Sequence, residues 1–165
     1  MILAFTVYGV AESKGSMTAR SFRLPNGHTI SKATNTNRNV AKWEDLIRSD
    51  ASRALYAMPE SDRCVNDGPV RLTIGFYLPR PQKYAKRGVP VAHLTAPDLD
   101  KLTRAVGDAL TGLAYRDDKQ VVEAVLGKFY ADVDDVPHVV IRVEPTAGVR
   151  PHVVAPAPLP LFAHA

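Results

Sequence analysis

The chain has 165 residues, a formal net charge of +4 and 45% apolar residues. This length predicts one domain with a substantial hydrophobic core, and the basic balance weakly favours an acidic partner. The absence of any run of 18 apolar residues excludes a transmembrane helix and a membrane partner, and the single cysteine, Cys64, excludes an intramolecular disulfide. We therefore expect a protein of the reducing cytoplasm.

The first half of the chain predicts two strands and one long helix. β-branched and aromatic residues predict a strand over 2–10. Residues 11–36 are rich in Gly, Ser, Thr and Asn and predict a loop, with a short hairpin near its Asn-Gly step. Apolar residues three and four apart predict a helix over 37–57. A polar connection over 60–68 precedes the strict alternation of a half-buried strand over 70–78.

The second half predicts a second helix and two further strands. Four basic residues with Pro and Gly predict an exposed loop over 79–88. The next apolar stripe predicts a helix over 98–110. Strands are expected over 120–130 and 138–144, and residues 132–137 are expected to connect them as a hairpin. From Pro145 the composition shifts to Pro, Ala, Val and His, which predicts a domain over 1–145 and a tail with little structure over 146–165.

Four carboxylates lie close together in this basic chain, at Asp98, Asp100, Asp117 and Asp118. Hard divalent cations such as Mg²⁺ take oxygen ligands, often one or two carboxylates plus substrate phosphates. If Asp98 caps the helix, it and Asp100 can turn towards one point, whereas neighbouring residues before a strand point opposite ways. Capping and turn chemistry explain the same residues without a metal. The spacing alone leaves both interpretations open.

Basic residues are spread through the two predicted loops and the start of the second helix. Such residues contact backbone phosphates in proteins that bind DNA without reading its sequence, although a charged loop is also typical of a solvated surface. The candidate DNA-binding residues are Lys14, Arg20, Arg23, Lys83, Lys86, Arg87 and Lys101.

Three motifs occur in a characteristic order over residues 97–128. They are Pro97-Asp98-Leu99-Asp100-Lys101-Leu102, Asp108-Ala109-Leu110-Thr111-Gly112 and Tyr115-Arg116-Asp117-Asp118-Lys119-Gln120-Val121-Val122, with Lys128 further on. This order resembles the RusA family of Holliday-junction resolvases, endonucleases that are common in phages and prophages. The resemblance implies an α+β fold, with a mixed β-sheet and two main packed helices.

The same resemblance implies a homodimer that cuts four-way DNA junctions with Mg²⁺, or with Mn²⁺ in its place. Matched position by position, the metal-binding aspartates are Asp98, Asp100 and Asp118. Asp117 and Lys128 are expected to lie beside them rather than on the metal.

Two positions depart from the family pattern. Lys101 stands where the family has asparagine, and Arg104 stands where it has a catalytic lysine. Arginine keeps the positive charge and can bind phosphate with two hydrogen bonds, but it does not release a proton. We therefore expect Arg104 to stabilise charge in the transition state without donating a proton.

Other functions compatible with these residues are a metal nuclease of broader scope, acting on forks, flaps or duplex DNA, and an inactive DNA-binding or structural phage protein. The intact set Asp98, Asp100 and Asp118 argues against loss of activity. A small-nucleotide phosphohydrolase is disfavoured because extended basic loops suit a polymeric substrate.

Overall fold

A computed structural model describes residues 1–148 of the chain. It leaves out residues 16, 24–27, 36, 64 and 86–91, and it describes only the backbone of 17–23, 29–35 and 85. Cys64, Lys86, Arg87 and the predicted tail beyond residue 148 therefore lie outside the described residues. The last strand ends at Pro145, and the boundary between domain and tail stays a prediction.

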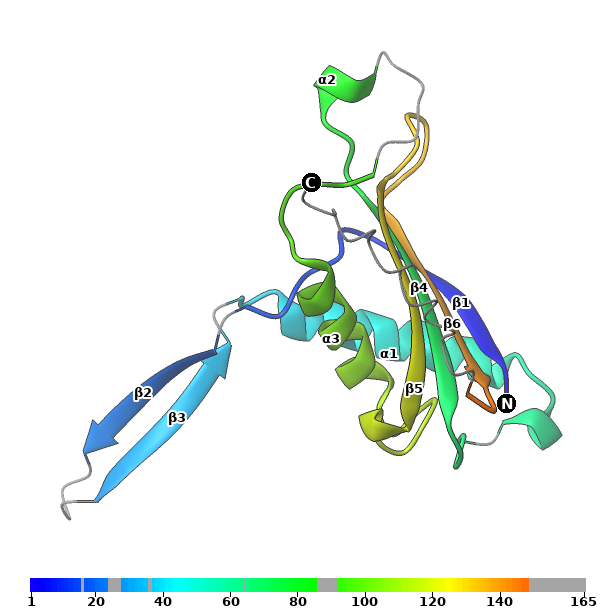
Figure 1. Cartoon of the computed structure of the whole chain (residues 1–165), viewed down its shortest axis with the longest axis horizontal. Coiled ribbons are helices and arrows are strands. Elements are labelled where there is room, and N and C mark those ends of the chain that lie inside the picture. The colour runs from blue at the N-terminus through cyan, green and yellow to red at the C-terminus, as the bar shows by residue number, and fades with distance from the viewer. Residues whose placement is uncertain (16, 24–27, 36, 64, 86–91, 149–165) are drawn as a thin grey trace, which may run out of the picture.

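A four-stranded mixed sheet forms the centre of the molecule (Figure 1). Its strands are β1 (Leu3–Tyr8), β4 (Val70–Leu78), β5 (Val121–Tyr130) and β6 (His138–Pro145). The order across the sheet is β1-β6-β4-β5, with β4 and β5 parallel and the other pairs antiparallel. In β4 every second side chain is buried, as its alternating sequence predicts.

Two long helices, α1 (Val40–Tyr56) and α3 (Leu99–Leu110), pack in one core with the sheet. In α1 the apolar stripe at three- and four-residue steps is buried, and in α3 the buried stripe includes Leu102 and Val106. Each such side chain contributes about 1.5–3 kcal/mol through burial. The expected α+β fold, with a mixed sheet and two main helices, is confirmed.

Three short helical turns complete the body of the protein. They are η1 (Glu60–Asp62), α2 (Gln82–Ala85) and η2 (Asp118–Gln120). The first two lie within segments that the sequence predicts as loops. Such short turns have no apolar periodicity that a sequence could reveal.

The predicted hairpin between the last two strands is wrong. β5 and β6 lie on opposite sides of β4, and the segment between them crosses the end of β4. Strands that follow each other in sequence usually pair. In β6, however, every second side chain is fully buried, namely Val139, Ile141 and Val143. A central position between β1 and β4 buries them, and β5 becomes the edge of the sheet.

Residues 17–23 and 29–35 form two paired strands rather than a loop with a short hairpin. β2 (Met17–Arg23) pairs with β3 (Thr29–Asn35) in an antiparallel ladder. This hairpin, which we call the arm, projects away from the sheet and helices (Figure 1). Its polar, threonine-rich sequence has no apolar face, so periodicity could not reveal strands of this length.

Within the described part of the chain, no helix combines the length and the hydropathy needed to cross a membrane.

Candidate active site

Asp98 and Asp100 lie at the N-terminal end of α3. Asp98 is the N-cap residue, with extended backbone angles (φ −69°, ψ 139°), and its carbonyl oxygen accepts from the Leu102 N–H at 3.1 Å. Its carboxylate makes no capping hydrogen bond and lies 2.8 Å from the Lys101 ammonium. The hydrogen bond from Lys101 lowers the pKa of Asp98. Both aspartates are exposed, so their carboxylates remain available to a ligand.

Lys128 fixes the position of the segment that precedes Asp98. Its ammonium donates hydrogen bonds to the carbonyl oxygens of Thr95 at 2.8 Å and Pro97 at 2.7 Å. These contacts attach the segment before α3 to β5. The charge of Lys128 also contributes to lowering the pKa of Asp98. The structure thus places the Lys128 ammonium against the segment that leads into Asp98.

Arg104 lies one helical turn after Asp100, and both residues are exposed. The i, i+4 spacing places them on one face of α3. Among the described residues, Arg104 has no hydrogen-bond or ion-pair partner. The exposed guanidinium, on the same face of α3 as Asp100, is therefore available to a phosphate group.

Asp117 and Asp118 lie at the other end of α3, around η2. Asp117 caps η2: its carboxylate accepts from the Lys119 N–H, and its own N–H donates to the Gln120 side chain, both at 3.0 Å. The backbone hydrogen bond from Lys119 lowers the pKa of Asp117. Asp118 borders an open pocket of about 400 Å³, shared with Asp108, Thr111, Arg116 and Asp117. Asp117 therefore has a local structural role, and Asp118 is the carboxylate that faces outward.

One copy of the chain does not bring the three predicted metal ligands together. Leu110, the last residue of α3, follows Asp100 by ten positions, which is about 15 Å along the helix axis. Asp98 lies beside Lys128 near the end of β5, whereas Asp118 comes just before the start of β5. No group of three His, Cys, Asp or Glu side chains within the described residues is arranged to hold a metal ion. Asp98 and Asp100 alone can offer oxygen ligands from one end of α3.

Lys14 links the base of the arm to both long helices. Its ammonium lies 2.8 Å from the Glu44 carboxylate on α1 and 2.5 Å from the Asp108 carboxylate on α3. Its backbone N–H donates to the Lys101 carbonyl oxygen at 3.2 Å. Partial burial lowers the pKa of Lys14, but its hydrogen bonds to Asp108 and Glu44 raise it overall. Sequence reasoning places Asp108 in a motif but misses this role, because no local pattern marks it.

The structure describes the backbone of some of the other predicted DNA-binding residues and the side chains of others. The backbones of Arg20 and Arg23 lie on β2 of the arm. Lys83 is exposed on α2, with its ammonium 4.8 Å from the centre of the Tyr84 ring. Lys101 is paired with Asp98.

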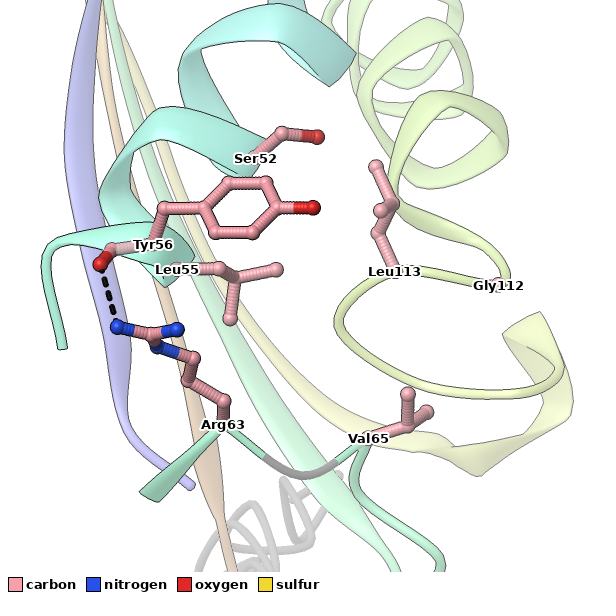
Figure 2. A pocket seen from close by; sticks show the side chains of 7 residues that line it. All are labelled: Ser52, Leu55, Tyr56, Arg63, Val65, Gly112 and Leu113. Carbon is pink, nitrogen blue, oxygen red and sulfur yellow. Dashed lines mark hydrogen bonds between the residues drawn. The ribbon is translucent and has the colours of Figure 1, made fainter. Parts of the chain in front are cut away.

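The apolar pocket of about 240 Å³ lies elsewhere, between the end of α1 and the segment after α3 (Figure 2). Leu55, Tyr56 and Leu113 are among the residues that line it, and the Arg63 guanidinium, which also lines it, donates to the Tyr56 carbonyl oxygen at 2.7 Å. No carboxylate lines it. Asp98 and Asp118 instead border two separate open pockets of about 410 and 400 Å³, which suit a large substrate better than a small enclosed one.

Comparisons with known proteins show the family of this chain. The profile of the endodeoxyribonuclease RusA family matches residues 20–144, which include most of the arm, both long helices and all four candidate aspartates. The chain belongs to the RusA family. A relative from Bacillus subtilis (strain 168), the uncharacterized protein YqaN, is 31% identical over 139 residues, which cover 79% of this chain and 89% of YqaN. Membership of the RusA family makes the chain one of a group of endodeoxyribonucleases.

Proposed function

We propose that this protein is a Mg²⁺-dependent endonuclease that cuts four-way DNA junctions as a homodimer. Family membership supports DNA cleavage, and the exposed carboxylates of Asp98, Asp100 and Asp118 are the ligand type that Mg²⁺ prefers. The observation that carries the dimer is the separation of these ligands. Asp98 and Asp100 lie at one end of α3 and Asp118 lies at the other.

A second copy can supply the missing ligand if the edge strands pair. β5 is a ten-residue edge strand with exposed Val122 and Val125, and long apolar edges of this kind favour pairing with another chain. The segment at Ala92 and His93 covers its far end, where the His93 N–H donates to the Lys128 carbonyl oxygen at 3.1 Å. This leaves residues 121–127 available for an intermolecular ladder.

Antiparallel pairing of two such edges about a two-fold axis at Ala124 sets residue 121 opposite residue 127 of the second copy. Asp118 lies just before β5. In this pairing it approaches the end of β5 of the second copy, where that copy carries Lys128 and Asp98. The two-fold axis produces two equivalent sites. Each site would combine Asp98 and Asp100 of one copy with Asp118 of the other.

When bound there, Mg²⁺ would lower the pKa of a coordinated water and neutralise charge on the scissile phosphate; Mn²⁺ takes similar ligands. Arg104 would stabilise negative charge on the phosphate through its guanidinium. Lys128 would hold Asp98 in place through the Pro97 and Thr95 carbonyls. The arm and the α2 region would contact backbone phosphates and orient the junction.

A cleavage assay tests this proposal directly. A mobile four-way junction, a fork and a linear duplex are incubated with the protein, with and without Mg²⁺, and with Asp100→Asn as a control. We expect cutting of the junction only with Mg²⁺ and only with intact Asp100. Equal cutting of the linear duplex would indicate a nuclease of broader scope, and tight junction binding without cutting would indicate a binding protein.

A further inference from the structure

The face of the sheet that lies away from α1 and α3 carries a row of four aromatic side chains, one on each strand. Tyr8, His138, Tyr77 and Phe129 are successive register partners across β1, β6, β4 and β5. The ring centres are 5.9 Å apart for Tyr8 and His138, 4.5 Å for His138 and Tyr77, and 5.8 Å for Tyr77 and Phe129. Tyr8 is 63% exposed and Phe129 is 40% exposed. We call these four residues the aromatic platform.

Two glycines make room for the Tyr77 and Phe129 rings of the platform. Gly75 and Gly127 are register partners, and each precedes Tyr77 or Phe129 by two residues on the same face. A Cβ at Gly127 would overlap the Phe129 ring, and a Cβ at Gly75 would lie 3.1 Å from the Tyr77 ring. Glycine weakens a strand interior and marks close approach of another group. Here it allows the Tyr77 and Phe129 rings to lean over the glycine positions, with the Tyr77 ring stacked on His138 at an interplanar angle of 16°.

Acidic side chains border the platform on one side. Asp132, Asp134 and Asp135 are all exposed in the connection between β5 and β6. Asp132 and Asp135 line a pocket of about 410 Å³ together with Tyr77, Tyr130, Phe129 and His138. Arg80 lies 3.6 Å from Asp132, and the His138 ring nitrogen lies 3.4 Å from Asp135. The surroundings are therefore acidic on a chain whose net charge is +4.

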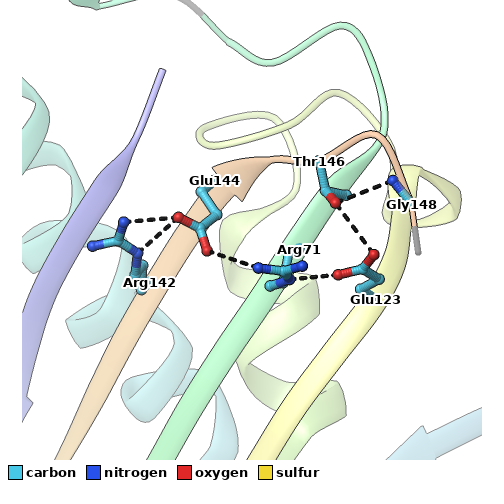
Figure 3. Close-up of polar contacts among 6 residues, drawn as sticks. All are labelled: Arg71, Glu123, Arg142, Glu144, Thr146 and Gly148. Atoms are coloured by element: carbon cyan, nitrogen blue, oxygen red, sulfur yellow. Dashed lines mark hydrogen bonds and ion pairs between the residues drawn. The ribbon is translucent and has the colours of Figure 1, made fainter. Parts of the chain in front are cut away.

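The opposite end of the same face carries charges that are already paired. Arg142, Glu144, Arg71, Glu123 and Thr146 form one connected chain of polar contacts (Figure 3). Arg142 donates to Glu144 at 2.7 Å, and Arg71 contacts both Glu144 and Glu123. Next to the platform, by contrast, the three exposed carboxylates of Asp132, Asp134 and Asp135 have one arginine partner among the described residues, Arg80.

We propose that the aromatic platform binds a segment of a partner protein that presents an arginine side chain. A planar guanidinium stacks on exposed ring faces, and the carboxylates of Asp132 and Asp135 can accept its N–H groups. The same carboxylates repel the phosphates of DNA. The platform lies on the face of the sheet away from α1 and α3, so this inference does not depend on the proposed nuclease function.

Binding of a fluorescent octa-arginine peptide to the full chain tests this inference. The His138 ring signals in NMR spectra report binding at the platform, and octa-lysine provides equal charge without a planar group. Gly127→Ala lifts the Phe129 ring, and Asp135→Asn removes a carboxylate. Gly68→Ala is the matched glycine control because no atom lies within 4 Å of the added Cβ. Asp62→Asn is the matched acidic control.

We expect saturable shifts of the His138 signals and roughly fivefold weaker binding after Gly127→Ala or Asp135→Asn, which corresponds to about 1 kcal/mol, the size of one stacked cation. The two controls should bind like the wild type, and octa-lysine should bind more weakly than octa-arginine. If Gly127→Ala fails to fold, Phe129→Leu replaces it. Equal binding by all variants would overturn the inference. Stronger His138 shifts with a twelve-residue oligothymidylate would overturn it in favour of nucleic acid, and self-association that Gly127→Ala abolishes would overturn it in favour of a second copy.

Discussion

The Lys128 ammonium lies 2.7 Å from the Pro97 carbonyl oxygen, directly before the first aspartate of α3. This contact joins β5 to the segment that positions Asp98. A second hydrogen bond from Lys128 to the Thr95 carbonyl oxygen makes the attachment rigid at two points.

Replacing Lys128 should therefore lower the free energy of unfolding and disturb the position of Asp98. Lys128→Met keeps the length of the side chain but leaves two carbonyl groups without their charged donor. Hydrogen bonds to charged groups contribute about 1.5–3 kcal/mol, so we expect a loss of roughly that size in the free energy of unfolding, measured by urea denaturation. Lys119→Met is the control, because Lys119 is exposed at η2. Equal stability of both variants would contradict this role.

The pKa of Asp98 should depend on Lys101. Because Lys101 lowers the pKa of Asp98 in the folded state, the pair stabilises the fold above the unfolded-state pKa, near about 3.9. That contribution is lost as the pH falls through the lower folded-state pKa. In metal-free NMR titrations, Lys101→Met should move the Asp98 midpoint upward. A midpoint that stays in place would show that the ion pair does not form in solution.

Two inactive variants should restore activity when they share a dimer. Asp100→Asn and Asp118→Asn should each abolish junction cutting as homodimers while leaving junction binding intact. In a mixed dimer with composite sites, one site carries both substitutions and the other carries neither. Mixed dimers should therefore nick supercoiled cruciform DNA at one strand and should bind Mn²⁺ at one site per dimer, measured by electron paramagnetic resonance.

The matched control for complementation mixes Asp98→Asn with Asp100→Asn. These substitutions affect the same end of α3, so every site of that mixed dimer keeps at least one of them and should stay inactive. If the mixture of Asp100→Asn and Asp118→Asn shows no activity, the site is not shared between copies. That result would not count against nuclease activity of the wild type.

The candidate site shows where sequence reasoning works and where it ends. The periodicity of α1, α3 and β4 predicts their boundaries within a few residues, because burial on one face leaves a direct pattern. The neighbours of β6 are not encoded in any local pattern, so the predicted hairpin with β5 is wrong. The clustering of aspartates in sequence likewise does not show that α3 holds them apart, since a helix separates residues that a loop would bring together.

Contacts made by single polar side chains are the least predictable part. The links from Lys14 to Glu44 and Asp108 join residues 30 and 94 positions apart, and no local pattern marks them. The same holds for Lys128, whose partners are backbone carbonyls. Only the family resemblance points to Lys128, and it does so without indicating which groups the ammonium binds.

Arg104 should act through its charge. Arg104→Lys keeps a cation on the same face of α3 as Asp100 and should retain much of the cutting rate. Arg104→Ala removes it and should lower the rate on the order of 10²-fold, as for other electrostatic stabilisers that are removed. Single-turnover cleavage with saturating protein measures this step apart from binding. Equal rates for the two variants would show that the charge has no part in the reaction.

The arm should supply affinity for DNA through its basic residues. Arg20, Arg23 and Lys32 lie on its two strands, away from the sheet and helices. Changing all three to glutamine should weaken junction binding and reduce the slope of log affinity against log salt by about 0.9 for each phosphate that the arm no longer neutralises. Lys42→Gln on the exposed side of α1 is the control and should leave the slope unchanged. Because Lys14 is paired with Glu44 and Asp108, Lys14→Met should change the slope less than the arm variant does. A triple variant with the wild-type slope would show that the arm does not touch the DNA backbone.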